Sequence, residues 1–159
     1  MSRYKKALKI EGQIQKVMSK NNKINFSLNK KLGGTEFMPF APITLEKYAN
    51  KMYLNYNKGK FTSKFMTVTY KCTEKMKKLS PATMHTDGTA RPQVINYKLN
   101  PKIYNVLKEY CKISKIPSLI NTNFNMHEEP IVCSPNDAIR GFLRSNIDFL
   151  FIGDFLVRK

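Results

Sequence analysis

The chain has no tryptophan and only three cysteines, and no apolar run approaches the roughly 18 residues that a membrane-spanning helix needs. Cys72, Cys111 and Cys133 lie far apart without a Cys-x-x-Cys pair, and His85 and His127 stand alone. The cysteines are therefore interpreted as reduced packing residues, and no metal site is predicted. The basic start also lacks the apolar stretch and cleavage site of a signal peptide. These absences predict a cytoplasmic protein with no membrane segment.

Acidic residues and arginine are scarce as well, which leaves a net charge of +17. Residues 1–80 hold 18 of the 28 Lys and Arg but only 4 of the 11 Asp and Glu. Such a basic half attracts polyanions, including nucleic acid, nucleotides and acidic protein surfaces. The excess is almost all lysine scattered among Asn and Ile, which a coding bias on a solvated face would also produce. Proteins that read base edges favour arginine, so nucleic acid is a possible but not a favoured partner.

What is present suits one folded domain, since 42% of the 159 residues are hydrophobic. Helical and strand patterns alternate, so the predicted class is α/β or mixed α+β, with a twisted mixed sheet flanked by helices. The predicted elements are helices at 4–18 and 23–31, an extended segment at 37–42, a helix capped by Thr44, strands at 64–70 and 93–95, a helix at 100–114, a strand at 117–121, a helix at 134–144, a strand at 147–152 and a last short strand after Gly153-Asp154.

The first segment that suits chemistry is a polar loop, His85-Thr86-Asp87-Gly88-Thr89-Ala90-Arg91. Gly88 permits a tight turn and Thr89 offers a hydroxyl. The planar guanidinium of Arg91 matches phosphate or carboxylate. These are the parts of an anion-binding loop, although a polar turn with an ion-paired arginine would read the same way.

The second segment is Asn121-Thr122-Asn123-Phe124-Asn125, directly after an apolar strand. Ligands bind at the carboxyl ends of strands in open α/β sheets, and these amides could hold a ribose, a base edge or a carbamoyl group. They could equally cap a turn. The carboxylates of Glu128 and Glu129 follow, and they could position a metal–nucleotide complex or simply solvate a loop.

Four ordered strings resemble one family: F-M-P-F-A-P (37–42), P-A-T-M-H-T-D-G-T-A-R-P-Q-V (81–94), N-T-N-F-N-M-H-E-E-P-I-V (121–132) and the tail from Ser134 to Lys159. They are similar to the carboxy-terminal domain of the NodU/CmcH-type O-carbamoyltransferases. The pattern there is approximately H-x-D-G-T-A-R-x-Q-x-V followed by N-T-S-F-N-x-x-G-E-P-I-V. Order and spacing agree over nearly the whole chain, which makes the match far more specific than either loop alone.

The resemblance implies a YrdC-like fold for a single domain at 1–159, with a basic helical entry segment at 1–34 and the best-matching core at 35–159. In this family the domain binds ATP and carbamoyl phosphate and forms carbamoyl-adenylate. A separate amino-terminal domain with an actin-like-ATPase fold passes the carbamoyl group to an acceptor hydroxyl, and it is the expected partner. Met1 falls inside the family's opening motif, so the reading frame could belong to a longer or split gene.

The resemblance also implies roles for individual residues. Arg91, Asn121 and Asn125 form the expected catalytic set, in which Arg91 holds phosphate and the two amides orient the carbamoyl group and the nucleotide. The expected binding residues are Lys6, Lys30, Lys31, His85, Asp87, Gly88, Thr89, Arg91, Thr122, Asn123 and Glu129. Magnesium is expected only as the complex with ATP.

Five departures from the family pattern involve charged residues. Lys6 and Glu11 align without gaps to arginines of the opening motif, and Gly34 and Met38 occupy positions where many members have arginine. Glu128 stands where the family has glycine before Glu-Pro. These changes weaken the positive charge that anionic substrates need, so we expect the chain alone to be a poor catalyst. The alternative is a diverged, non-catalytic basic module that binds RNA or a partner protein.

Overall fold

The computed structural model describes residues 40–126 and 128–159. These residues divide into two compact units, 40–121 and 122–159 without residue 127. The helices predicted at 4–18 and 23–31, and most of the extended segment at 37–42, lie outside the described residues. Within the described ranges, no helix is long and apolar enough to cross a membrane.

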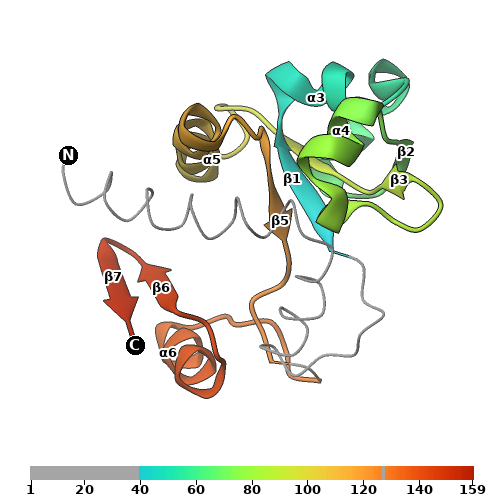
Figure 1. The fold of residues 1–159 in the computed structure, drawn as a ribbon. Coiled ribbons are helices and arrows are strands. Elements are labelled where there is room, and N and C mark those ends of the chain that lie inside the picture. Colours follow the sequence, from blue (N-terminus) through green and yellow to red (C-terminus); the bar gives the residue numbers. More distant parts are fainter. Residues whose placement is uncertain (1–39, 127) are drawn as a thin grey trace. The chain divides into compact units, whose positions relative to one another are not determined.

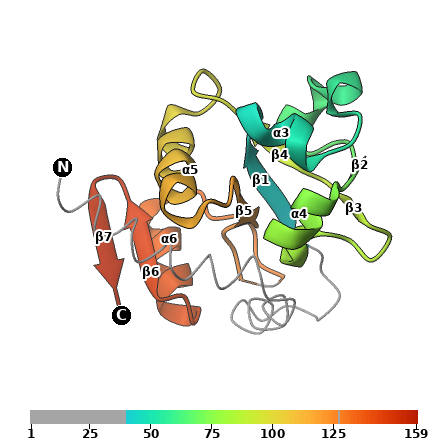
Figure 2. The ribbon, with the colours of Figure 1, turned by 45° about the horizontal axis from the view of Figure 1, so that its top comes forward.

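The first unit alternates short strands and helices. Its elements are β1 (Ala41–Leu45), α3 (Glu46–Met52), 3₁₀ helices at Tyr56–Gly59 and Thr62–Phe65, β2 (Tyr70–Lys71), α4 (Glu74–Leu79), a 3₁₀ helix at Pro81–Thr83, β3 (Thr89–Ala90), β4 (Gln93–Ile95), α5 (Pro101–Ser114) and β5 (Ser118–Asn121). Figure 1 shows α5 on one side of β1 and α4 on the other, and the turned view in Figure 2 agrees.

The central feature of this unit is a mixed three-stranded sheet in the order β4-β1-β5. Strand β1 runs parallel to β4, with Ile43 opposite Gln93, and antiparallel to β5, with Ala41 opposite Asn121. Neighbouring side chains of a strand point to opposite faces, so Val94 and Ile95 enter different cores. The predicted mixed α/β class is confirmed.

Each side of this sheet carries its own hydrophobic core. One core joins β4 to the helices α3 and α4 through the buried side chains of Ala49, Met52, Tyr53, Met76 and Val94. The other joins β1 and β5 to α5 through Leu45, Ile95, Leu107, Ile116 and Leu119. The two cores fix the three strands whose ends carry the predicted site residues.

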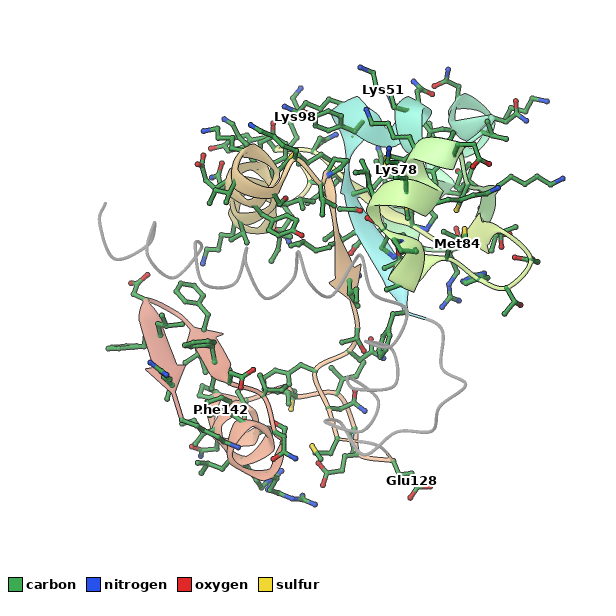
Figure 3. All side chains as sticks on the ribbon, in the orientation of Figure 1. Lys51, Lys78, Met84, Lys98, Glu128 and Phe142 are labelled. Atoms are coloured by element: carbon green, nitrogen blue, oxygen red, sulfur yellow. The ribbon has the colours of Figure 1, made fainter. Side chains whose placement is uncertain are left out.

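The second unit consists of α6 (Pro135–Arg144) and a hairpin of β6 (Phe149–Ile152) and β7 (Phe155–Arg158). Ala138, Phe142 and Leu150 form its small core, and Figure 3 labels Phe142 on α6. The predicted helix start at Ser134 is confirmed as a capping box, because Ser134 and Asp137 satisfy each other's backbone N–H groups.

The predicted helix start at Asn100 is confirmed in the same way, since its side chain accepts from the backbone of Ile103. The predicted cap at Thr44 is wrong. Thr44 lies fully buried inside β1, where its hydroxyl contacts that of Tyr53 at 2.7 Å. Helix α3 starts one residue after Leu45, without a side-chain cap.

The strand predicted at 64–70 is also largely wrong, because only Tyr70 at its end enters a strand. Residues Thr62–Phe65 form a 3₁₀ helix instead. The hydroxyls of Thr62 and Ser63 donate to the carbonyls of Gly59 and Lys60, and such local bonds compete with sheet formation. The sequence pattern also gave no indication of α4 or β3.

Candidate functional site

The loop at 85–91 closes a tight turn. The backbone N–H of His85 donates to the Thr89 carbonyl at 2.7 Å, and that of Gly88 donates to the His85 carbonyl at 3.0 Å. Gly88 has φ +79°, a conformation that glycine adopts without steric cost. Its carbonyl accepts from the N–H of Cys72 at 2.9 Å, so the turn is anchored to the strand beside it.

The side chains of His85, Asp87 and Thr89 form hydrogen bonds with one another. The Asp87 carboxylate accepts from the Thr89 backbone at 2.9 Å and from the Thr89 hydroxyl at 2.7 Å. These hydrogen bonds lower the pKa of Asp87 below its ordinary value, with the side-chain bond contributing most. Because the hydroxyl gives its one hydrogen to Asp87, it must accept from His85 Nδ1, which lies 3.1 Å away. His85, Asp87 and Thr89 therefore hold the turn in shape.

Arg91 follows this rigid turn and is exposed. Four arginines lie in the described ranges, and the other three have partners within them. Arg140 pairs with Asp137, Arg144 pairs with Glu129, and Arg158 lies over the Phe149 ring. Arg91 makes no ion pair with a carboxylate of residues 40–126 or 128–159. Among the described residues, its guanidinium therefore has no carboxylate partner.

Asn121 ends β5 and meets two residues of the same unit. Its Nδ2 donates to Gln93 Oε1 at 3.0 Å and to Met66 Sδ at 3.4 Å. Gln93 begins β4 only two residues after Arg91. The structure therefore brings Asn121, the first residue of the second predicted segment, into contact with Gln93, which lies two residues after the first segment.

The remaining predicted residues of this segment belong to the second unit. Asn125 Nδ2 donates to the carbonyls of Met126 and Glu129, both at 2.9 Å, so this amide caps a turn. The Glu129 carboxylate pairs with Arg144, while Thr122 and Asn123 are exposed. A common ligand-binding role for the 85–91 and 121–125 segments stays a prediction.

Glu128 adopts a left-handed backbone conformation with φ +65°, and Figure 3 shows its side chain pointing away from the ribbon. Non-glycine residues adopt this conformation only at an energetic cost. The family pattern has glycine at this position, and the backbone geometry gives a physical reason for that preference. The substitution therefore concerns the shape of the turn as well as its charge.

The sequence analysis did not predict Gln93 and Met66 as site residues. Gln93 matches the glutamine of the family string, so a signal for it existed. Met66 gave no signal, because its segment was interpreted as a strand. Lys6, Lys30 and Lys31 lie outside the described residues, so their predicted binding roles stay predictions.

Metal-binding groups are sparse in the part of the chain that the structure describes. Within the described residues, no three or more His, Cys, Asp or Glu side chains lie close enough together to hold a metal ion.

Cys72, next to the 85–91 loop, is buried, and burial raises the pKa of its thiol to about 11. It therefore remains protonated at neutral pH and is a poor nucleophile.

Comparisons with known proteins agree on one family. The model of the carbamoyltransferase C-terminus matches residues 16–159. An uncharacterized protein of Methanocaldococcus jannaschii is 37% identical over 132 residues, which are 83% of this chain and 25% of that protein. Nodulation protein NolO of Bradyrhizobium diazoefficiens is 39% identical over 123 residues, 77% of this chain and 22% of that protein.

A third relative, nodulation protein NolNO of Sinorhizobium fredii, is 35% identical over 139 residues, or 87% of this chain and 20% of that protein. The chain thus spans between 20% and 25% of the length of these curated relatives. The family match extends over most of the chain and includes both polar segments described above. The chain therefore belongs to the carbamoyltransferase C-terminus family.

Proposed function

We propose that this chain binds ATP and carbamoyl phosphate and forms carbamoyl-adenylate for transfer to an acceptor hydroxyl. The balanced reaction also consumes one water. Water releases phosphate from carbamoyl phosphate, an oxygen of the resulting carbamate attacks the α-phosphorus of ATP, and pyrophosphate leaves. Magnesium enters with the phosphates of ATP. A YrdC-like arrangement of the whole domain and a cytoplasmic location stay predictions.

The observation that carries this proposal is the exposed Arg91, whose guanidinium pairs with no carboxylate of the described residues. It follows a turn held by Asp87 and Thr89, and it lies two residues before Gln93, which contacts Asn121. A preorganised cation next to a polar amide can hold two anions against their mutual repulsion. In the proposed reaction Arg91 holds phosphate, and Asn121 orients the carbamoyl group.

The test compares two arginines by replacing each with lysine. Lysine reproduces a bidentate guanidinium–phosphate contact poorly, so Arg91→Lys should weaken binding of carbamoyl phosphate or Mg-ATP by about 1.5–3 kcal/mol. Arg140→Lys is the matched control, because Arg140 is exposed and already paired with Asp137 at 2.8 Å. Calorimetric titration of the full 159-residue chain measures both. Equal affinities for Arg91→Lys and the control would contradict the proposal.

The proposed partner is the amino-terminal, actin-like-ATPase-fold part of a carbamoyltransferase. Strand β7 is the surface on which we expect this partner to dock. Its apolar residues Phe155, Leu156 and Val157 are 75%, 43% and 40% exposed. Successive side chains of a strand alternate in direction, so both faces of β7 are open. A two-stranded hairpin is marginally stable alone, and relatives are four to five times longer than this match. We expect this amino-terminal part to cover β7.

This partner proposal is tested with the neighbouring reading frame. If that frame encodes the expected domain, its purified product should slow hydrogen exchange in residues 149–158. The exposed helix face of α5, on the first unit, serves as an internal reference. Protection that spreads evenly over all lysine-rich segments would indicate charge attraction instead.

A second candidate function is binding of RNA by a non-catalytic module. One observation favours it: Phe61 and Phe65 are 69% and 60% exposed, and Lys64 lies 5.1 Å from the Phe61 ring centre. Exposed aromatic rings beside lysines suit single-stranded bases. Steeply salt-dependent binding to unrelated RNAs, without any binding of Mg-ATP, would favour this candidate.

A further inference from the structure

The side-chain amide of Asn121 has a defined orientation. Its two contacts are Gln93 Oε1 at 3.0 Å and Met66 Sδ at 3.4 Å. A thioether sulfur accepts hydrogen bonds and cannot donate them. The group of Asn121 that faces Met66 must therefore be the NH₂ group, and Gln93 must turn its carbonyl oxygen toward the same nitrogen. Met66 thus removes the ambiguity that asparagine amides otherwise have.

This orientation decides what Asn121 can offer a ligand. Both hydrogens of Nδ2 are used by Gln93 and Met66, and no residue within 40–126 or 128–159 donates to Oδ1. Asn121 as a whole is only partly buried. Toward a substrate Asn121 is consequently a hydrogen-bond acceptor and cannot serve as a donor.

The position of Met66 is itself fixed by the surrounding chain. Its backbone has φ +57°, which is unfavourable for a residue with a side chain and persists only where the surroundings impose it. The preceding 3₁₀ helix ends there, and the Thr67 hydroxyl donates to the carbonyl of Thr62 at 3.1 Å. These features constrain the backbone of Met66, whose sulfur accepts from Asn121.

We infer that Gln93 and Met66 are positioning residues, which hold Asn121 as the acceptor for the NH₂ group of the carbamoyl substrate. This inference rests on the proposed function. Carbamoyl phosphate and acetyl phosphate share the acyl-phosphate end and differ in carrying NH₂ or CH₃. An acceptor-only amide favours NH₂, because a methyl group would leave Oδ1 without a partner. Asn121 thereby selects carbamoyl phosphate over acetyl phosphate.

The experiment measures this selection on the full 159-residue chain. Dissociation constants for carbamoyl phosphate and acetyl phosphate are determined for the wild type, Gln93→Leu and Gln93→Glu. Gln93→Leu removes the acceptor that orients Asn121, so the preference for carbamoyl phosphate should fall about five- to tenfold. Gln93→Glu keeps an acceptor and should keep the preference. Its added charge acts equally on both ligands and cancels in the ratio.

A preference that is unchanged in Gln93→Leu would overturn the inference. The adenine amino group and ribose hydroxyls of ATP are also donors, so Mg-ATP affinity is measured in parallel. A loss confined to Mg-ATP would show that Asn121 accepts from the nucleotide, which overturns the assignment to the carbamoyl group. The expected result is an Mg-ATP affinity that changes less than the carbamoyl preference.

A measurement without ligand tests the orientation of the Asn121 amide separately from the proposed function. In the wild type, the NMR signals of the Asn121 side-chain NH₂ should show slow exchange with water, and Gln93→Leu should abolish this protection. Absence of protection in the wild type would overturn the orientation itself. Protection together with no binding of carbamoyl phosphate would overturn the proposed function and leave the orientation standing.

Discussion

Replacing Glu128 by glycine should stabilise the protein. Glu128 has φ +65° and an exposed side chain, so the substitution removes little packing. The left-handed conformation costs a residue with a Cβ about 1–2 kcal/mol. Glycine avoids this cost, but it gives up roughly 0.5–1 kcal/mol through the greater freedom of the unfolded chain. The expected net gain in the free energy of unfolding is about 0.5–1 kcal/mol.

Two controls isolate the backbone effect. Glu128→Ala removes the same charge but keeps the Cβ, so it should not gain stability. Lys115→Gly tests the same mechanism elsewhere, because Lys115 ends α5 with φ +63° and glycine is preferred at such helix ends. The two glycine substitutions lie in different units, so their effects should be additive.

The assay is urea unfolding followed by circular dichroism, since the chain has no tryptophan. With a slope near 2 kcal/mol per molar, the midpoint of Glu128→Gly should rise by about 0.4 M over that of Glu128→Ala. An unchanged slope would confirm that stability alone has changed. A Glu128→Gly midpoint at or below that of Glu128→Ala would refute the reasoning from backbone conformation.

Three further predictions follow from local geometry. Ser134→Ala should lower the free energy of unfolding by about 1 kcal/mol in urea titrations, because it removes the cap of α6. Iodoacetamide should label Cys133, which is exposed, well before the buried Cys72 and Cys111, and peptide mass spectrometry would show the order. The pKa of Asp87 is lower in the folded protein than in the unfolded chain. Its ionised carboxylate therefore stabilises the fold at a pH above the pKa of the unfolded chain, and this stabilisation is lost as the pH falls through the lower pKa of the folded state. Asp87→Asn should therefore differ most from the wild type near neutral pH, and the difference in urea midpoint should shrink below about pH 4.

The sequence by itself determined the features that depend on neighbouring residues. Asn100-Pro101 and Ser134-Pro135 start α5 and α6 as predicted, because a cap acts within one helical turn. The apolar run before Asn121 forms β5, and the ordered motifs identified the family over most of the chain. The polar character of both candidate segments was likewise visible in the sequence.

Tertiary structure decided which partner each polar group has. Thr44 looks like a cap, but its hydroxyl meets Tyr53 inside the unit because β1 is the central strand. The β-branched pattern at 64–70 found no neighbouring strand along most of its length, so local side-chain bonds prevailed. Arg91 was expected either to bind an anion or to pair with a carboxylate, and only the fold shows that no described carboxylate reaches it.

The orientation of Asn121 shows most clearly that the sequence alone does not reveal the partner of a polar group. Its contact with Gln93 joins residues 28 positions apart, and its contact with Met66 joins residues 55 positions apart. No local preference encodes such contacts. The contact with Gln93 arises only when β4 and β5 pack on either side of β1, and the contact with Met66 only when the 3₁₀ helix before it packs in the same unit. The sequence named asparagine as a site residue, and the pairing of distant strands determined that its oxygen, and not its nitrogen, is left for a substrate.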